Sequence, residues 1–156
     1  MKRNSGARLG ILLLVLLSTA TQARLPAAAI ASAHPLASEA GFEILDQGGN
    51  AFDAAVAVSA ALAVVEPHGS GMGGGGFWLL HQADGGRNIM IDGREAAPGA
   101  ASRDMYLDNR GQVVRDWAIN GPSAAGIPGQ PAALAHLASR YGRLPLSTTL
   151  APAIRL

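Results

Sequence analysis

The feature that most constrains the fold is a stretch from Ala51 to Val65 that is apolar on almost every side. Only Asp53, which suits the positive end of a helix dipole, and Ser59 interrupt it with polar groups. Asn50 is a typical N-cap residue at the start of the stretch, and Pro67 disfavours helical geometry in the residue that precedes it. The stretch between them therefore predicts a single helix. A helix without a polar face is buried all round. We therefore expect this helix to be covered on every side and packed closely against a sheet.

A glycine-rich loop, GSGMGGGGF at residues 69–77, follows this helix. It contains the pattern G-x-G-x-x-G, with Gly71, Gly73 and Gly76, which binds dinucleotide phosphates when a strand precedes it and a helix follows. Here the order is reversed, and no Gly-Lys-Ser/Thr completes a Walker loop. We therefore expect the glycines to allow a sharp turn and the close approach of a neighbouring segment, and we expect no nucleotide cofactor.

Local signals predict the neighbouring elements. Two short apolar runs, 77–80 and 88–91, flank the turn residues 83–86 and predict a β-hairpin. Upstream, a helix is predicted over about 35–47, because a proline occupies the first helical position and an apolar stripe follows it. Two consecutive glycines end this helix. The alanine-rich residues 24–33 are expected to form a strand.

Composition excludes several classes of function. A net charge of +1, with 15% charged residues, does not suit a nucleic-acid-binding surface. The chain has no cysteine, which removes disulfides, thiolate metal sites and cysteine nucleophiles. No zinc motif or i, i+4 pair is present among the histidines, so no metal is expected. These are His34, His68, His81 and His136.

The first residues have the pattern of a secretion signal. Lys2 and Arg3 supply positive charge, residues 9–17 are apolar, and small residues ending at Ala23 suit a signal peptidase. The apolar run falls short of the roughly 20 residues that a stable membrane span needs. We expect a signal peptide at residues 1–23, cleavage, and export to the periplasm or the medium. An uncleaved N-terminal anchor stays open as the alternative.

Several motifs together resemble one known family. In order and with natural spacing, they match the start of the large subunit of γ-glutamyltransferases from about Ile30 to Leu156. The motifs are HPLASEAGFEILDQGGNAFDAAVAVSAALAVVEPHGSGMGGGGF, DGREAAP, MYLD, GIPGQPAAL, RYGRLPL and PAIRL. Two departures are Gly69, where the family usually has serine, and Ala96, where it usually has threonine. Both affect the local hydrogen bonding that the resemblance would imply.

The resemblance implies an α/β (α+β) fold of the N-terminal-nucleophile hydrolase type, an αββα sandwich of two stacked sheets between helix layers. Such proteins are precursors that cut themselves and expose a threonine at the start of a small subunit. That threonine attacks the γ-glutamyl amide of glutathione and passes the acyl group to water, an amino acid or a dipeptide. No cofactor or metal is implied.

The same resemblance indicates that the catalytic nucleophile lies outside this chain. Thr148 and Thr149 fall in a segment similar to one far upstream of the processing site, so we interpret them as helix-start residues. Ser70 lies in the glycine-rich loop but lacks a surrounding G-x-S-x-G motif, and His68 beside it has no partner to activate. Residues 24–156 are therefore expected to be an N-terminal fragment of the large subunit, inactive without the remainder.

Arg94 is the candidate substrate-binding residue. By position, it matches the family arginine that binds the α-carboxylate of the glutamyl group. A guanidinium suits this role because it is always charged and binds a carboxylate through two parallel hydrogen bonds. Residue type alone favours an ion pair with Glu95 or Asp92 that only fixes the loop, and the ordered family motifs reverse this preference.

The sequence leaves three other classes of protein open. A cephalosporin-acylase-like relative would share the architecture and act on another amide. The second is a non-catalytic exported binding module. If the chain by itself is soluble and folds cooperatively, that result would favour this class. A nucleotide-binding enzyme is the third alternative, and nucleotide titration would identify it.

Overall fold

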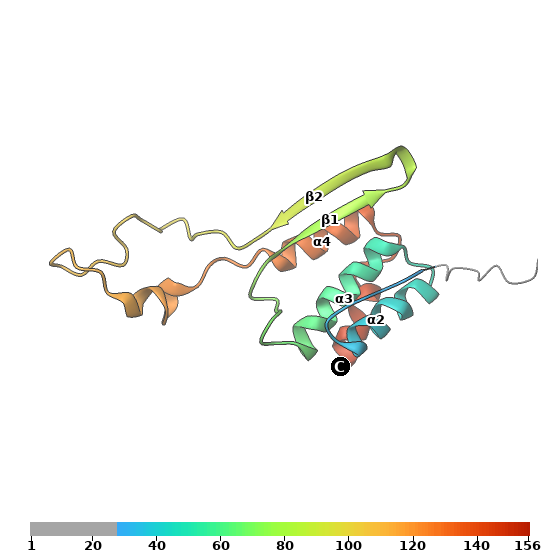
Figure 1. Cartoon of the computed structure of the whole chain (residues 1–156), viewed down its shortest axis with the longest axis horizontal. Coiled ribbons are helices and arrows are strands. Elements are labelled where there is room, and N and C mark those ends of the chain that lie inside the picture. Colours follow the sequence, from blue (N-terminus) through green and yellow to red (C-terminus); the bar gives the residue numbers. More distant parts are fainter. Residues whose placement is uncertain (1–27) are drawn as a thin grey trace, which may run out of the picture.

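A computed structural model describes residues 28–156, and the expected signal peptide at residues 1–23 lies outside this part of the chain. The regular elements are helices α2 (Pro35–Asp46) and α3 (Ala51–Val65), strands β1 (Gly76–Gln82) and β2 (Arg87–Gly93), and helices α4 (Gln130–Tyr141) and α5 (Leu146–Arg155). Short 3-10 helices are η1 (Asp84–Gly86), η2 (Arg115–Ala118) and η3 (Pro122–Ala124). The β1–β2 hairpin lies over α4, and α2, α3 and α5 pack together beneath (Figure 1).

Helix α3 begins and ends where the sequence predicts. The Asn50 side chain accepts hydrogen bonds from the backbone N–H groups of Phe52 (2.8 Å) and Asp53 (3.0 Å), and the Asp53 carboxylate accepts one from the Asn50 N–H (2.9 Å). This reciprocal capping box satisfies donors that a helix N-terminus leaves free. Helix α3 packs against α2, α4 and α5.

The expectation that α3 is buried on all faces is wrong for the described residues. Ala57 and Ala61 are fully buried, but Val64 is 46% exposed. Ala55 and Val58 line an open groove of about 600 Å³ beside residues 28–31. The helix packs against α2, α4 and α5, and the groove and Val64 mark the part of its apolar surface that the described residues leave uncovered.

Asp53 also joins α3 to the loop between α4 and α5. Its carboxylate is fully buried and accepts hydrogen bonds from the backbone N–H groups of Arg143 (2.9 Å to Oδ2) and Leu144 (3.3 Å to Oδ1). The Asn50 side chain donates to the Tyr141 carbonyl at 2.7 Å. These bonds hold the end of α4 against the start of α3.

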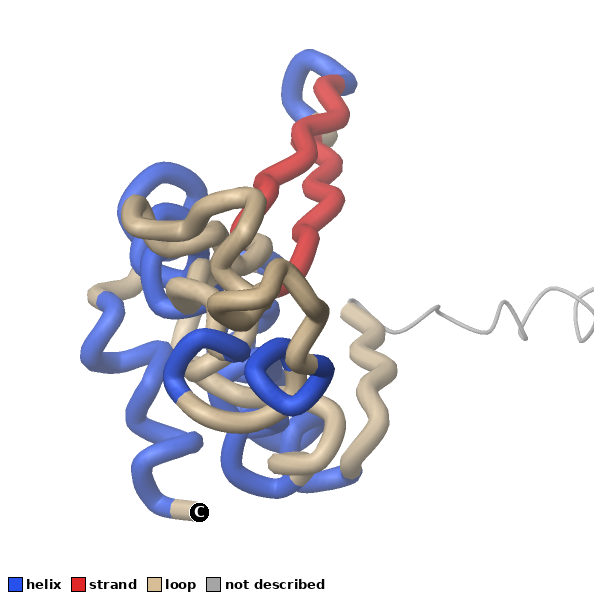
Figure 2. The backbone as a smooth tube through the Cα atoms, turned by 90° about the vertical axis from the view of Figure 1, so that its left-hand side faces the viewer, coloured by secondary structure: helices blue, strands red, loops and turns tan. Residues whose placement is uncertain are grey.

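The predicted hairpin is confirmed and is slightly longer than predicted. β1 and β2 are antiparallel, with Leu79 opposite Met90 and Leu80 opposite Ile89. Gly85 and Gly86 have φ values of +80° and +61°, which explains the glycines in the turn. The hairpin stands out from the helical part of the molecule (Figure 2).

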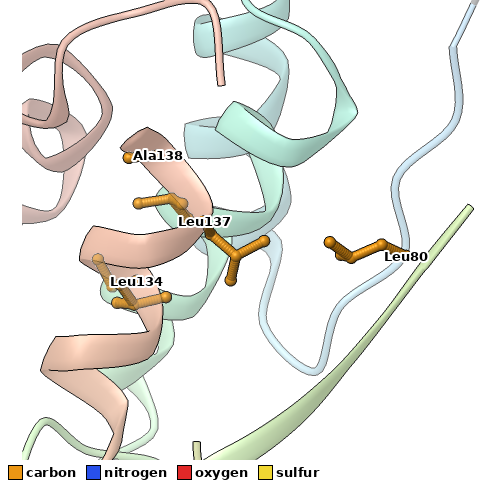
Figure 3. Close-up of a cluster of buried hydrophobic side chains, with 6 residues drawn as sticks. Leu80, Leu134, Leu137 and Ala138 are labelled. Atoms are coloured by element: carbon orange, nitrogen blue, oxygen red, sulfur yellow. The ribbon is translucent and has the colours of Figure 1, made fainter. Parts of the chain in front are cut away.

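The two faces of the hairpin have different environments. Leu80 on the inner face is buried against Leu134 and Leu137 of α4 and Val56 of α3. Figure 3 shows the Leu80 side chain directed toward this helical cluster. On the outer face Phe77, Leu79 and Met90 are 56%, 79% and 65% exposed.

The predicted mixed α and β class is confirmed. Of the expected αββα sandwich, residues 28–156 supply a two-stranded sheet with helices on one of its faces. The other sheet of the sandwich is not among these residues. No helix within them is long and apolar enough to cross a membrane.

The strand predicted over residues 24–33 is wrong for its described part. Residues 28–33 form no strand and run as irregular chain. Strand formation needs a neighbour for backbone hydrogen bonds, and the described sheet contains only β1 and β2. Helix α2 begins at Pro35 as predicted, with the His34 imidazole accepting a hydrogen bond from the Leu36 N–H (3.2 Å).

Candidate functional site

Arg94 lies directly after β2, at the point where the chain leaves the sheet. The Asp92 carboxylate accepts a hydrogen bond from the Arg94 backbone N–H at 3.0 Å, so this neighbour fixes the turn through the main chain. The Arg94 side chain is 70% exposed, and its Nε lies 3.9 Å from Glu95 Oε2. No other ion pair or hydrogen bond joins the guanidinium to residues 28–156. Both terminal nitrogens are therefore free to bind a carboxylate.

The glycine-rich loop lies against the segment that carries Arg94. The Gly74 carbonyl accepts hydrogen bonds from the N–H groups of Gly129 and Gln130, both at 3.1 Å. A Cβ atom built on Gly75 would lie 2.8 Å from the Arg94 Cα. The predicted close approach is therefore confirmed, and the loop leads into β1 rather than into the helix that a phosphate-binding loop requires.

An arm, residues 97–126, begins beside Arg94 and returns to the start of α4. It extends away from the rest of the molecule (Figure 1). Ala96 and Ile127 pair at its base through two backbone hydrogen bonds of 3.1 and 2.8 Å. Farther out, the Tyr106 hydroxyl donates to the Ser123 carbonyl at 2.9 Å. A pocket of about 230 Å³ lies between these two links, with Arg94 among its lining residues.

The remaining candidates from the sequence do not assemble into a site. His68 is exposed, with Nε2 3.8 Å from the Glu66 carboxylate, and the Ser70 N–H donates to the Glu66 carbonyl. Thr148 and Thr149 lie in the first turn of α5, as predicted, and the Thr149 hydroxyl donates to the Leu146 carbonyl at 3.0 Å. No cluster of three or more metal-ligating side chains occurs within residues 28–156.

The other histidines have local structural roles or none. His34 caps α2, as described above. His81 Nδ1 lies 2.8 Å from Asn88 Oδ1 across the hairpin. The His136 ring lies edge-on to Tyr141, with ring centroids 5.9 Å apart. They are far apart in the chain, and within residues 28–156 they share no partner.

Gly129 was not singled out by the sequence, although it contacts the segment that carries Arg94. A Cβ atom on Gly129 would lie 2.5 Å from the Arg94 carbonyl oxygen. Its only sequence signal is its place in GIPG, just before a helix, which also suits an ordinary N-cap. The contact joins residues far apart in the chain, so local patterns could not reveal it.

The fold places the chain among the N-terminal-nucleophile hydrolases. It resembles the crystal structure of Helicobacter pylori γ-glutamyltranspeptidase with a TM-score of 0.80 and 45% identity, over 85% of this chain and 38% of that one. It also resembles a cephalosporin acylase from Bacillus halodurans, with a TM-score of 0.65 and 31% identity, over 86% of this chain and 26% of that one.

Within that class, the chain belongs to the γ-glutamyltranspeptidase family, whose model matches residues 37–156. A glutathione hydrolase proenzyme of Pseudomonas aeruginosa is 41% identical over 146 residues, which are 94% of this chain and 26% of that protein. The chain therefore spans about a quarter of the length of this relative.

Proposed function

We propose that the intact protein hydrolyses or transfers γ-glutamyl groups. Its donor would be glutathione or a related γ-glutamyl compound, and its acceptors water, amino acids or dipeptides. The nucleophile would be the N-terminal threonine of a small subunit cut from the same precursor. The observation that carries this proposal is the family match over residues 37–156, a range that contains Arg94 directly after β2.

Arg94 would bind the α-carboxylate of the donor. Its exposed guanidinium contacts Glu95 only through Nε at 3.9 Å, which leaves the two terminal nitrogens for a bidentate contact. An exposed pair at this distance contributes little to stability, about 0 to 1 kcal/mol. The geometry therefore favours ligand binding over the alternative that Arg94 only fixes the loop.

Residues 1–23 would direct the precursor out of the cytoplasm and then be removed. Residues 24–156 would form the first part of the large subunit. The positive, apolar and small-residue sections of the leader support this proposal.

The test replaces Arg94 in the full-length precursor and compares two donors. Charge-assisted hydrogen bonds contribute about 1.5 to 3 kcal/mol each, so Arg94→Ala should lower kcat/KM for a γ-glutamyl anilide by at least about a hundredfold. The same substitution should lower kcat/KM much less for an analogue that has an α-amide in place of the α-carboxylate. Arg94→Lys should recover part of the activity, because an ammonium keeps the charge but loses the planar fork.

A matched control is Arg110→Ala, which removes an exposed arginine from the arm and should leave both donors unaffected. Equal losses on both donors, together with a lower melting temperature or a block in processing, would make Arg94 a scaffold residue.

The alternative amide substrate can be examined with the same preparation. Turnover of a cephalosporin amide in preference to the γ-glutamyl anilide would favour an acylase. The higher TM-score and identity to the γ-glutamyltranspeptidase structure support the γ-glutamyl assignment.

A further inference from the structure

The backbone around Arg94 lies where three segments of the chain cross. One is the end of β2 with residues 93–95, the second is the glycine-rich loop at Gly75, and the third is Gly129 at the start of α4. A Cβ atom on Gly75 would lie 2.8 Å from the Arg94 Cα and 2.8 Å from the Glu95 nitrogen. A Cβ atom on Gly129 would lie 2.5 Å from the Arg94 carbonyl oxygen and 2.6 Å from the Gly93 carbonyl carbon.

These contacts are with backbone atoms, which cannot turn aside as a flexible side chain can. Real Cβ atoms essentially never come within 3.0 Å of such a neighbour, and ordinary contact begins at 3.4 Å. An alanine at Gly75 or Gly129 would therefore push the 93–95 segment, or be pushed by it. The atom nearest to both built Cβ atoms is the Gly93 carbonyl oxygen, so restoring ordinary packing needs a displacement of about 1 Å.

The requirement is for space and not for an unusual backbone conformation. Neither Gly75 nor Gly129 is among the described glycines with positive φ. Gly71 and Gly73, in the same loop, have no atom within 4 Å of a built Cβ. The loop therefore contains glycines that touch the Arg94 segment and glycines that do not.

We infer that Gly75 and Gly129 are positioning residues that hold Arg94 where its guanidinium meets the donor carboxylate. This inference rests on the proposed role of Arg94. The Gly74 carbonyl accepts hydrogen bonds from the N–H groups of Gly129 and Gln130, which joins the loop next to Gly75 to the start of α4 at Gly129. A shift of about 1 Å in a binding group can cost about a hundredfold in rate, so a small displacement is enough to be measured.

The experiment introduces Gly75→Ala and Gly129→Ala separately into the full-length precursor, with Gly71→Ala and Gly73→Ala as matched controls. For each variant, kcat and KM are measured on a γ-glutamyl anilide and on its α-amide analogue. The discrimination ratio is kcat/KM for the first donor divided by kcat/KM for the second. Melting temperature and the extent of processing are recorded in parallel.

The ratio should fall by at least about tenfold in Gly75→Ala and Gly129→Ala, mainly through KM, and by less than about twofold in the controls. A merely structural effect would lower activity on both donors and leave the ratio unchanged, which would overturn the inference. Failure of both variants to give folded, processed enzyme would also overturn it, because the glycines would then serve the fold and not the position of Arg94.

The Arg94→Ala variant separates the two levels of the proposal. If Arg94→Ala itself leaves the ratio unchanged, the proposed role of Arg94 fails. If Arg94→Ala lowers the ratio while Gly75→Ala and Gly129→Ala keep it, the role of Arg94 stands and only the positioning inference fails.

Discussion

Replacing Asp53 by alanine should strongly destabilise the protein. The Asp53 carboxylate is fully buried and accepts hydrogen bonds from the backbone N–H groups of Asn50, Arg143 and Leu144. In Asp53→Ala these three partly buried donors lose their partner. Each buried unsatisfied donor costs about 1 to 3 kcal/mol, and the contributions are not fully additive.

The expected loss is therefore about 3 to 5 kcal/mol in the free energy of unfolding, among the larger effects of single substitutions. Asp53→Asn keeps the shape and one acceptor oxygen, so its loss should be smaller, about 1 to 3 kcal/mol. Asp46→Ala is the matched control, since Asp46 is exposed at the end of α2 and its removal should change stability by less than about 0.5 kcal/mol.

The assay is thermal unfolding of the full-length precursor variants, followed by circular dichroism. In a precursor about as long as the Pseudomonas aeruginosa relative, roughly four times this chain, each kcal/mol shifts the melting temperature by about 1 °C, so Asp53→Ala should melt about 3 °C or more below the parent protein. A decrease of less than about 2 °C would refute the reasoning, because it would mean that the loop from Arg143 to Leu144 does not need this carboxylate. An equal decrease in Asp46→Ala would refute it as well.

Two further predictions concern the chain as a whole. Residues 24–156 expressed without the rest of the precursor should aggregate and show no γ-glutamyl anilide turnover, because Phe77, Leu79 and Met90 form an uncovered apolar face. A product that is monomeric in light scattering, melts cooperatively in calorimetry or turns over the anilide would contradict this. The exported protein should begin near Arg24, and N-terminal sequencing that still finds Met1 would show that the leader is retained.

The elements that sequence predicted well are those with local signals. Asn50 caps α3 through donors two and three residues away, and the turn glycines of the hairpin have the positive φ that their residue type favours. Helix α2 likewise begins at its proline. In each case the residues that determine the boundary are near neighbours in the chain.

The features that sequence missed depend on distant partners. Asp53 was expected to favour the helix dipole, but its bonds to Arg143 span 90 positions and have no local signature. The alanine-rich residues before α2 have no strand to pair with in the described part, so their strand prediction failed. Residue type alone favoured an ion pair over a binding role for Arg94, and only the ordered family motifs favoured binding.

The pairing of Ala96 with Ile127 affects how freely the arm can change in length. Both ends of the arm are held side by side at its base, so the residues between them form a closed loop. The number of residues in this loop does not determine the distance between β2 and α4. The entropic cost of closing such a loop grows only with the logarithm of its length, about 0.6 kcal/mol for each doubling. Related chains could therefore gain or lose residues in the arm while Arg94 keeps its place.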